Sequence, residues 1–255
     1  MTRFYKSLWF VFVAIFALSC SDDDSLPLPT AAFEVQPAEI EVGVPVMFDN
    51  LSINAARYEW DFGDGLDPIT DISPSVTFTT PGSVTVTLKA FTADEQFVET
   101  SQEITVKERI LTGIFVNIYP ETNADAAWDP DETGVDSLAD IIIQLLPADS
   151  PEDDQVVVAG PFNNLTAPFS ISINPDNNRI VLTDEEWRFV IIDFDGEDIA
   201  NATNDDFVTI SGVQFDQLQA PTVKNDEGDA GFISIRVVNQ AVQGLLDVDL
   251  TFRLE

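Results

Sequence analysis

Alternation of apolar and polar residues with a period of two is the feature that most limits how this chain can fold. It is clear at Val84, Val86 and Leu88, and no stretch keeps helical spacing between capping residues. The same spacing recurs at Ile114, Val116 and Ile118, at Phe169, Ile171 and Ile173, and at Leu246, Val248, Leu250, Phe252 and Leu254. Such alternation buries one face of a strand and exposes the other. The chain has 255 residues, enough for two domains, so we expect an all-β protein with two β-sandwich domains in tandem.

The first residues have the three-part layout of a secretory signal peptide. Arg3 and Lys6 precede an apolar run from Leu8 to Leu18, and small residues follow it up to Cys20. The run is shorter than the roughly 20 apolar residues that cross a bilayer. The stretch ALSC resembles the lipobox of bacterial lipoproteins, in which the cysteine is lipidated and becomes the mature N-terminus. An ordinary signal peptide with an incidental cysteine is the alternative.

The lipobox resemblance implies that residues 1–19 are removed and that acyl chains on Cys20 hold the protein on a membrane. Residues 20–30 then form the lipidated cysteine and an acidic, proline-containing tether. An acidic run after the cysteine also resembles the signal that sends lipoproteins of some Gram-negative bacteria to the outer face of the outer membrane. We therefore expect a lipid-anchored protein of the outer membrane, at the cell surface.

Composition excludes several classes of function. The chain has 45 acidic and 11 basic residues and a formal charge of −34, which disfavours nucleic acid as a partner. It has no histidine, and Cys20 is its one cysteine, which excludes Ser-His-Asp and Cys-His catalysis and zinc held by either residue. A hydrolase that uses a pair of carboxylates remains possible by composition, but we expect no enzymatic activity.

The motif WDFGDG, at residues 60–65, is the most specific in the chain. Tyr58, Trp60 and Phe62 alternate toward one face, which predicts that Trp60 packs in a core. Gly63, Asp64 and Gly65 predict a tight turn, because glycine tolerates positive φ and aspartate bonds its own backbone.

Residues 31–107 resemble the PKD domain, a small immunoglobulin-like sandwich of extracellular proteins. The resemblance extends from WDFGDG to the opening AAFEV and the closing SVTFTTPGSVTVTLKAFT and EITV. It implies a spacer, or a module that contacts proteins or glycans. Asp61 and Asp64 are interpreted as turn-forming carboxylates, with a metal or sugar site as the alternative.

Residues 111–255 are expected to form the second domain, after a boundary between Lys107 and Leu111. Two acid-rich stretches there each follow an apolar strand: NADAAWDPDETGVDSLADIII and EEWRFVIIDFDGEDIANATNDDFVTI. Calcium takes six to eight oxygen ligands, and loops rich in aspartate supply them. Plain solvated loops are the alternative.

The arrangement resembles a C2 domain, an eight-stranded sandwich that binds calcium between aspartates of its apical loops. Asp140 stands where a loop ends and a strand starts, Asp193 and Asp195 form an Asp-x-Asp pair, and Asp206 follows later. For a first-loop ligand Asp129, Asp131 and Asp136 compete, with Asp131 slightly favoured. The resemblance therefore implies a calcium site formed by Asp131, Asp140, Asp193, Asp195 and Asp206.

Two tryptophans have alternative interpretations. Trp187 is in register with Phe189 and Ile191, which predicts core packing rather than a sugar-stacking surface. Trp128 lies in a loop and fits either a core contact or an exposed platform.

The leading hypothesis is a non-catalytic surface lipoprotein that binds calcium and serves adhesion, assembly or support of an envelope complex. Its partners would be envelope proteins or glycans. The alternatives are a glycan-binding accessory module of a polysaccharide-capture system and a carboxylate-dependent hydrolase.

Overall fold

The computed structural model describes residues 27–63, 67–120, 128, 138–151, 157–195, 207–239 and 244–255. The expectations for the signal peptide, Cys20 and most of the tether lie outside these residues. So do Asp64, Gly65, Asp129, Asp131, Asp136 and Asp206. Over the described part of the chain, no helix has the length and apolarity to cross a membrane.

The first domain is a sandwich of two sheets. One sheet has the order β1-β3-β5, formed by Phe33–Gln36, Pro45–Asn50 and Ser75–Thr77. The other has the order β2-β7-β6-β4, formed by Ile40–Glu41, Phe97–Lys107, Gly82–Phe91 and Arg57–Asp61. β2 pairs with β7 in parallel, and the other described pairs of this domain are antiparallel.

Aromatic side chains fill the space between these two sheets. Trp60 is fully buried, and its indole Nε1 donates a hydrogen bond to the Asp71 carbonyl at 3.0 Å. Its ring lies 6.0 Å from Phe48 and 6.3 Å from Phe62, centroid to centroid. The alternation of the WDFGDG strand therefore reflects real burial.

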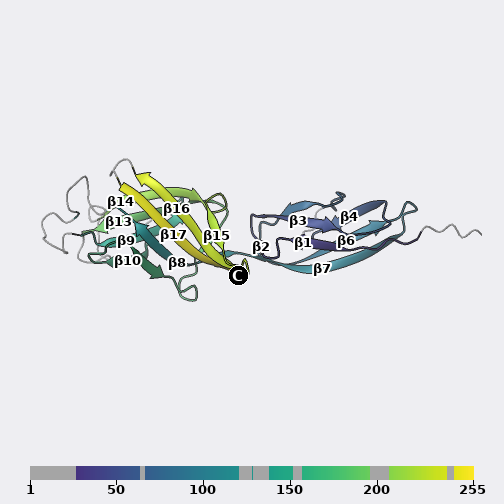
Figure 1. Ribbon diagram of the computed structural model, residues 1–255, viewed down its shortest axis with the longest axis horizontal. Helices are drawn as coiled ribbons and strands as arrows, with labels where there is room; N and C mark the ends of the chain where they lie inside the picture. Colours follow the sequence, from purple (N-terminus) through teal and green to yellow (C-terminus); the bar gives the residue numbers. More distant parts are fainter. Residues whose placement is uncertain are drawn as a thin grey trace, which may run out of the picture.

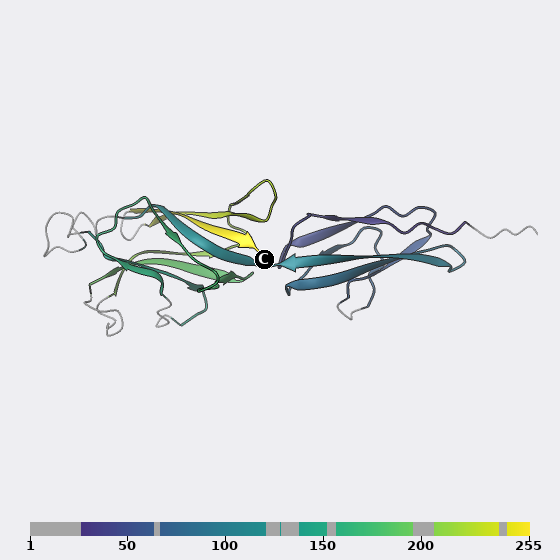
Figure 2. The same cartoon turned by 90° about the horizontal axis from the view of Figure 1, so that it is seen from below.

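The second domain also has two layers. The larger sheet has the order β11-β8-β17-β16-β15, formed by Phe169–Ser172, Arg109–Ile118, Gly244–Leu254, Ala230–Asn239 and Thr222–Lys224, and β12 (Val181–Leu182) also pairs with β8. The smaller sheet has the order β10-β9-β13-β14, formed by Val157–Phe162, Ile141–Pro147, Glu186–Phe194 and Phe207–Asp216. Figure 2 shows the two layers face to face. The prediction of two all-β sandwiches in tandem is confirmed.

Alternation predicts burial well in the second domain, with two informative differences. The inward residues of β17 are buried, but Ile118, the last residue of β8, is 41% exposed. The run Ile141–Leu146 of β9 is buried at every position, so this strand is buried on both faces. On its outer face Ile142 packs with Val190, Ile192 and Phe194.

The two domains lie end to end and meet at a short joint (Figure 1). β7 ends at Lys107 and β8 begins at Arg109, so Glu108 alone separates the two strands. Glu108 exchanges backbone hydrogen bonds with Glu255, at 2.9 and 3.1 Å. The last residue of the chain thus lies at the joint.

A buried ion pair forms the centre of the joint. Glu41 of the first domain is 2% exposed, and Arg109 is 7% exposed. The Arg109 Nε donates to a Glu41 carboxylate oxygen at 2.6 Å, and its Nη1 donates to the carbonyl and side-chain oxygens of Gln217 at 2.7 and 2.9 Å. Lys224 forms an ion pair with the other Glu41 oxygen. Desolvation lowers the pKa of Arg109 to about 10, which leaves the guanidinium charged at neutral pH.

Backbone packing at Gly43 also holds the domains together. Gly43 has a φ of +79°, which favours glycine. A Cβ at this position would lie 2.9 Å from the Leu218 Cδ1 and 3.1 Å from the Asp184 Cβ, both in the second domain. The turn after β2 therefore packs directly on the neighbouring sandwich.

We expect Arg109→Met to lower the free energy of unfolding by about 3 kcal/mol, because it leaves Glu41 buried without its guanidinium partner. The double variant Glu41→Met/Arg109→Met should recover most of this loss, since two apolar side chains replace the pair. Urea denaturation measures both. Arg57→Met is the control, because its ion pair with Glu95 is exposed and should change stability by less than about 1 kcal/mol. Equal losses in the single and double variants would show that the loss does not come from a buried Glu41 carboxylate without its guanidinium partner.

Candidate functional site

Acidic residues gather at the end of the second domain that lies away from the joint. β9 starts at Ile141, which pairs with Asp193 near the end of β13, and Phe194 pairs with Phe207 at the start of β14. Because these strands are antiparallel neighbours, the start of β9, the end of β13 and the start of β14 meet at one edge of the sandwich. In Figure 1 this edge lies at the far left, opposite the joint. We call it the distal end.

Asp193 and Asp140 are in contact there. Asp193 is 1% exposed, and its Oδ1 accepts a hydrogen bond from the Asp140 backbone N–H at 2.9 Å. The Asp140 carbonyl in turn accepts a hydrogen bond from the Phe194 N–H at 2.9 Å. The Asp193 carboxylate thereby holds Asp140, the residue that precedes β9, against the end of β13.

The Asp140 carboxylate has a similar local role. Its Oδ1 accepts a hydrogen bond from the Asn164 backbone N–H at 2.8 Å. Asn164 has a φ of +54° and lies in the turn after β10. Asp140 therefore joins this turn to the distal end. Asp195, directly after β13, is exposed.

One hydrogen bond joins Asp140 to Asp193, and Asp195 follows β13 at the same end, but these three side chains do not form a cluster that could hold a metal ion. Asp131 and Asp206 lie outside the described residues, although Phe207, next to Asp206, pairs with Phe194 at the same end. Among the residues that the structure describes, no three acidic side chains lie close enough together to hold a metal ion. Calcium binding therefore stays a prediction.

The remaining predicted residues have structural roles. The Asp61 Oδ1 accepts a hydrogen bond from the Gly63 N–H at 2.8 Å, as in a turn. Trp187 is buried in the core of the second domain. Trp128 is 7% exposed, and its Nε1 donates to the Pro120 carbonyl at 3.1 Å, so it closes the core instead of forming an exposed platform.

Sequence reasoning missed the joint. Glu41 lies between Ile40 and Val42, and Arg109 begins the apolar run of β8. A charged residue inside an apolar strand is a signal of a buried partner. The signal does not name that partner, which lies far away in the sequence.

Comparison with known proteins identifies the first domain. The model of the PKD domain family matches residues 27–107. The PKD resemblance of the first domain is confirmed. A comparison with curated protein sequences gave no significant match.

Three solved structures are similar to parts of the chain. The PKD1 domain of the Vibrio cholerae metalloprotease PrtV is 31% identical over 31% of this chain and 98% of its own, with a TM-score of 0.28. The PKD1 domain of Vibrio anguillarum Epp is 26% identical over 31% of this chain and 94% of its own, also with a TM-score of 0.28. A structure of carbohydrate-binding modules from the β-sandwich superfamily is 13% identical over 89% of this chain and 93% of its own, with a TM-score of 0.31.

We expect Asp140→Ala to lower the free energy of unfolding by about 1–3 kcal/mol, because the Asn164 N–H loses its acceptor. Urea denaturation measures the loss. Asp176→Ala is the matched control, since Asp176 is exposed in a loop of the same domain and should change stability by less than about 0.5 kcal/mol. If the two variants are equally stable, the Asp140 bond does not support the distal end.

Proposed function

We propose that this protein is a lipid-anchored, non-catalytic spacer that presents a calcium-binding end away from a bacterial outer membrane. The observation that carries the proposal is the end-to-end arrangement of the two sandwiches about a buried joint (Figure 1). β1 leads from the outer end of the PKD domain toward the joint, and the distal end lies at the opposite extreme of the molecule. In this role it serves adhesion, assembly or support of an envelope complex.

The joint supports this proposal because it resists bending. The β7 and β8 strands are separated by one residue, and the Glu41–Arg109 pair is shielded from water. Rotation of one domain would expose Gln217 and separate the charges in a partly desolvated site, which is costly. A spacer whose domains keep one orientation holds its distal end at a fixed reach from the tether.

Calcium binding at the distal end is the second part of the proposal. Asp140, Asp193 and Asp195 lie at this end, and in the sequence Asp140 belongs to the first acid-rich stretch and Asp193 and Asp195 to the second. Calcium sites of extracellular modules work at millimolar affinity, so a loosely built set of carboxylates and carbonyls suffices. A bound cation would relieve repulsion between the carboxylates and stabilise the folded state by mass action.

We expect calcium at about ten times its dissociation constant to stabilise the protein by roughly 1.4 kcal/mol, a rise of about 3–6 °C in melting temperature. Asp195→Asn should remove the rise and leave the melting temperature in chelator unchanged, because Asp195 is exposed. Asp193→Asn alone should also abolish the rise. It should in addition lower the melting temperature in chelator, since the Asp193 carboxylate accepts a hydrogen bond from the Asp140 N–H.

Calorimetric melting in calcium and in chelator at equal ionic strength measures these effects. Asp176→Asn, which removes an exposed carboxylate elsewhere in the domain, should keep the full rise. Identical melting curves in calcium and chelator would remove the calcium part of the proposal and leave the spacer role to stand on the joint.

Membrane attachment depends on Cys20. We expect Cys20→Ala to move the protein from the membrane fraction to the soluble fraction of cells, because the chain has no other cysteine thiol that could carry the acyl chains. Detergent phase partitioning of both proteins measures the change. A Cys20→Ala protein that still partitions into detergent would contradict the lipid anchor.

A further inference from the structure

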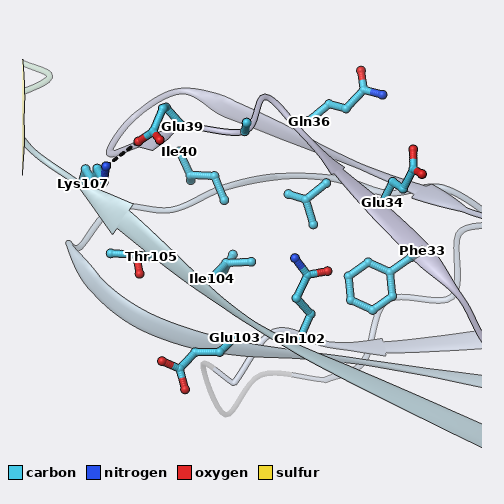
Figure 3. Close-up of a pocket in the computed structure, with 12 residues that line it drawn as sticks. Phe33, Glu34, Gln36, Glu39, Ile40, Gln102, Glu103, Ile104, Thr105 and Lys107 are labelled. Carbon is cyan, nitrogen blue, oxygen red and sulfur yellow. Dashed lines mark hydrogen bonds and ion pairs between the residues drawn. The ribbon is translucent and has the colours of Figure 1, made fainter. Parts of the chain in front are cut away.

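A groove runs along one side of the PKD domain, where its two sheets part. Its volume is about 670 Å³, and β1, the segment before β2, and β7 line it. Figure 3 shows Ile104 and Gln102 pointing from β7 toward Ile40 and Phe33 across the groove. Its lining is mixed: Phe33 and Val35 supply partly exposed apolar surface, and charged residues such as Glu34 and Glu103 stand on its rim.

The outer backbone edge of β7 borders this groove at Glu103 and continues beyond it to Ser101 and Glu99. Thr92 N–H donates to the Gln96 carbonyl across the β6–β7 turn, and the register pairs Phe91 with Phe97. In an antiparallel ladder, alternate residues bond to the partner strand. The backbone groups of Glu99, Ser101 and Glu103 therefore point away from β6.

The pairing of β2 supports this assignment. Val42 N–H donates to the Lys107 carbonyl. Lys107 and Ser101 are both odd-numbered residues of β7, so their backbone groups point to the same side of the strand. Among the described strands, β2 is the one that pairs on this side of β7, and it reaches only Val106 and Lys107. The edge from Glu99 to Glu103 is thus an open hydrogen-bonding edge.

The edge of β1 faces the groove from the other sheet. Leu51 N–H donates to the Ala32 carbonyl, so the even-numbered residues of β1 bond to β3. The backbone groups of Phe33 and Val35 consequently point away from β3. The groove is bordered by two strand edges that the described residues leave open.

Side chains along β7 divide by face. The even-numbered positions turn inward, as the burial of Ile104 and Val106 shows, and the odd-numbered positions are mostly exposed. Glu99 and Glu103 therefore stand on the outer face of β7. Neither forms an ion pair within the part of the chain that the structure describes, and the same holds for Glu34 on the groove rim.

We propose that this groove binds an extended basic segment of a partner protein, which adds to β7 as a further strand beside Ser101. Backbone hydrogen bonds to the open edge supply affinity in this mode of recognition, and alternate side-chain pockets supply specificity. The apolar residues of the segment lie over Phe33 and Val35, which are partly exposed in the groove. Its lysine or arginine residues lie beside Glu99 and Glu103 as cross-strand neighbours.

Charge selects this occupant over a second copy of the chain. Two copies paired edge to edge would bring Glu99 and Glu103 of each against those of the other, in molecules that each carry a formal charge of −34. Like charges directly opposite one another destabilise a strand pair. A basic segment meets the same carboxylates with the opposite sign.

The probe is a capped peptide of about eight residues, the length of one strand, that alternates lysine with valine. We expect calorimetry with residues 27–255 to show saturable one-to-one binding. Ser101→Pro should weaken binding at least about tenfold, because proline removes the outward N–H of Ser101. The pairing of β7 with β6 should persist, since this N–H does not bond to β6. Ser101→Ala is the matched control and should bind normally, since it loses only the hydroxyl contact to Thr87.

A charge-reversal variant tests the same site without proline. Glu99→Lys/Glu103→Lys should weaken binding by about tenfold or more through like-charge repulsion, whereas Asp71→Lys, an exposed reversal outside the groove, should have little effect. A peptide of the same composition with all lysines before all valines should bind at least about tenfold more weakly.

Three results would overturn the proposal. The first is the absence of binding, and the second is equal binding of the alternating and block peptides, which would show non-specific attraction to an acidic protein. The third is a dimer in sedimentation that Ser101→Pro dissolves, because the edge would then belong to a second copy. Binding of a neutral oligosaccharide that Ser101→Pro leaves intact, together with no peptide binding, would assign the groove to a glycan.

Discussion

The buried carboxylate of Glu41 fixes how the two domains sit on one another. Taking a carboxylate and a guanidinium out of water costs several kcal/mol per ion, and the cost is offset only when the groups find good partners. Glu41 comes from the first domain, Arg109 from the strand that begins the second, and Gln217 and Lys224 from separate parts of the second. All four groups are satisfied only in one relative orientation, so the reach of the distal end follows from this contact.

Local patterns predicted the strands because alternation reports directly on burial. The inward residues of β17 and the aromatic residues around Trp60 behave as their spacing indicates. The pattern failed at Ile118, because a β-bulge between the Val116–Val248 pair and the Ile118–Asp247 pair puts Ile118 on the face of Asp247 instead of the core face. It also gave no face for Ile141–Leu146, since a strand covered on both sides has no polar alternation to read.

Contacts between distant segments could not be predicted in the same way. Arg109 reaches a carboxylate 68 residues before it and a glutamine 108 residues after it. The groove likewise needs β1 and β7, the first and last strands of the PKD domain. Resemblance to another fold grouped Asp140 with Asp193, but it did not indicate that both carboxylates accept backbone N–H bonds. Those roles depend on where the chain turns, which residue spacing does not fix.

The distribution of the scarce cations connects the joint to the distal end. The chain has 11 lysines and arginines against 45 acids, yet several of these cations pair with acids at the joint: Lys107, Arg109, Arg179 and Lys224. Two acidic domains in contact would otherwise repel one another, so neutralising the joint is a condition for docking. This use of the cations leaves Asp140, Asp193 and Asp195 gathered at the opposite extreme. The proposed calcium site at that end follows the same logic, because cations engaged at the joint cannot neutralise carboxylates at the opposite extreme.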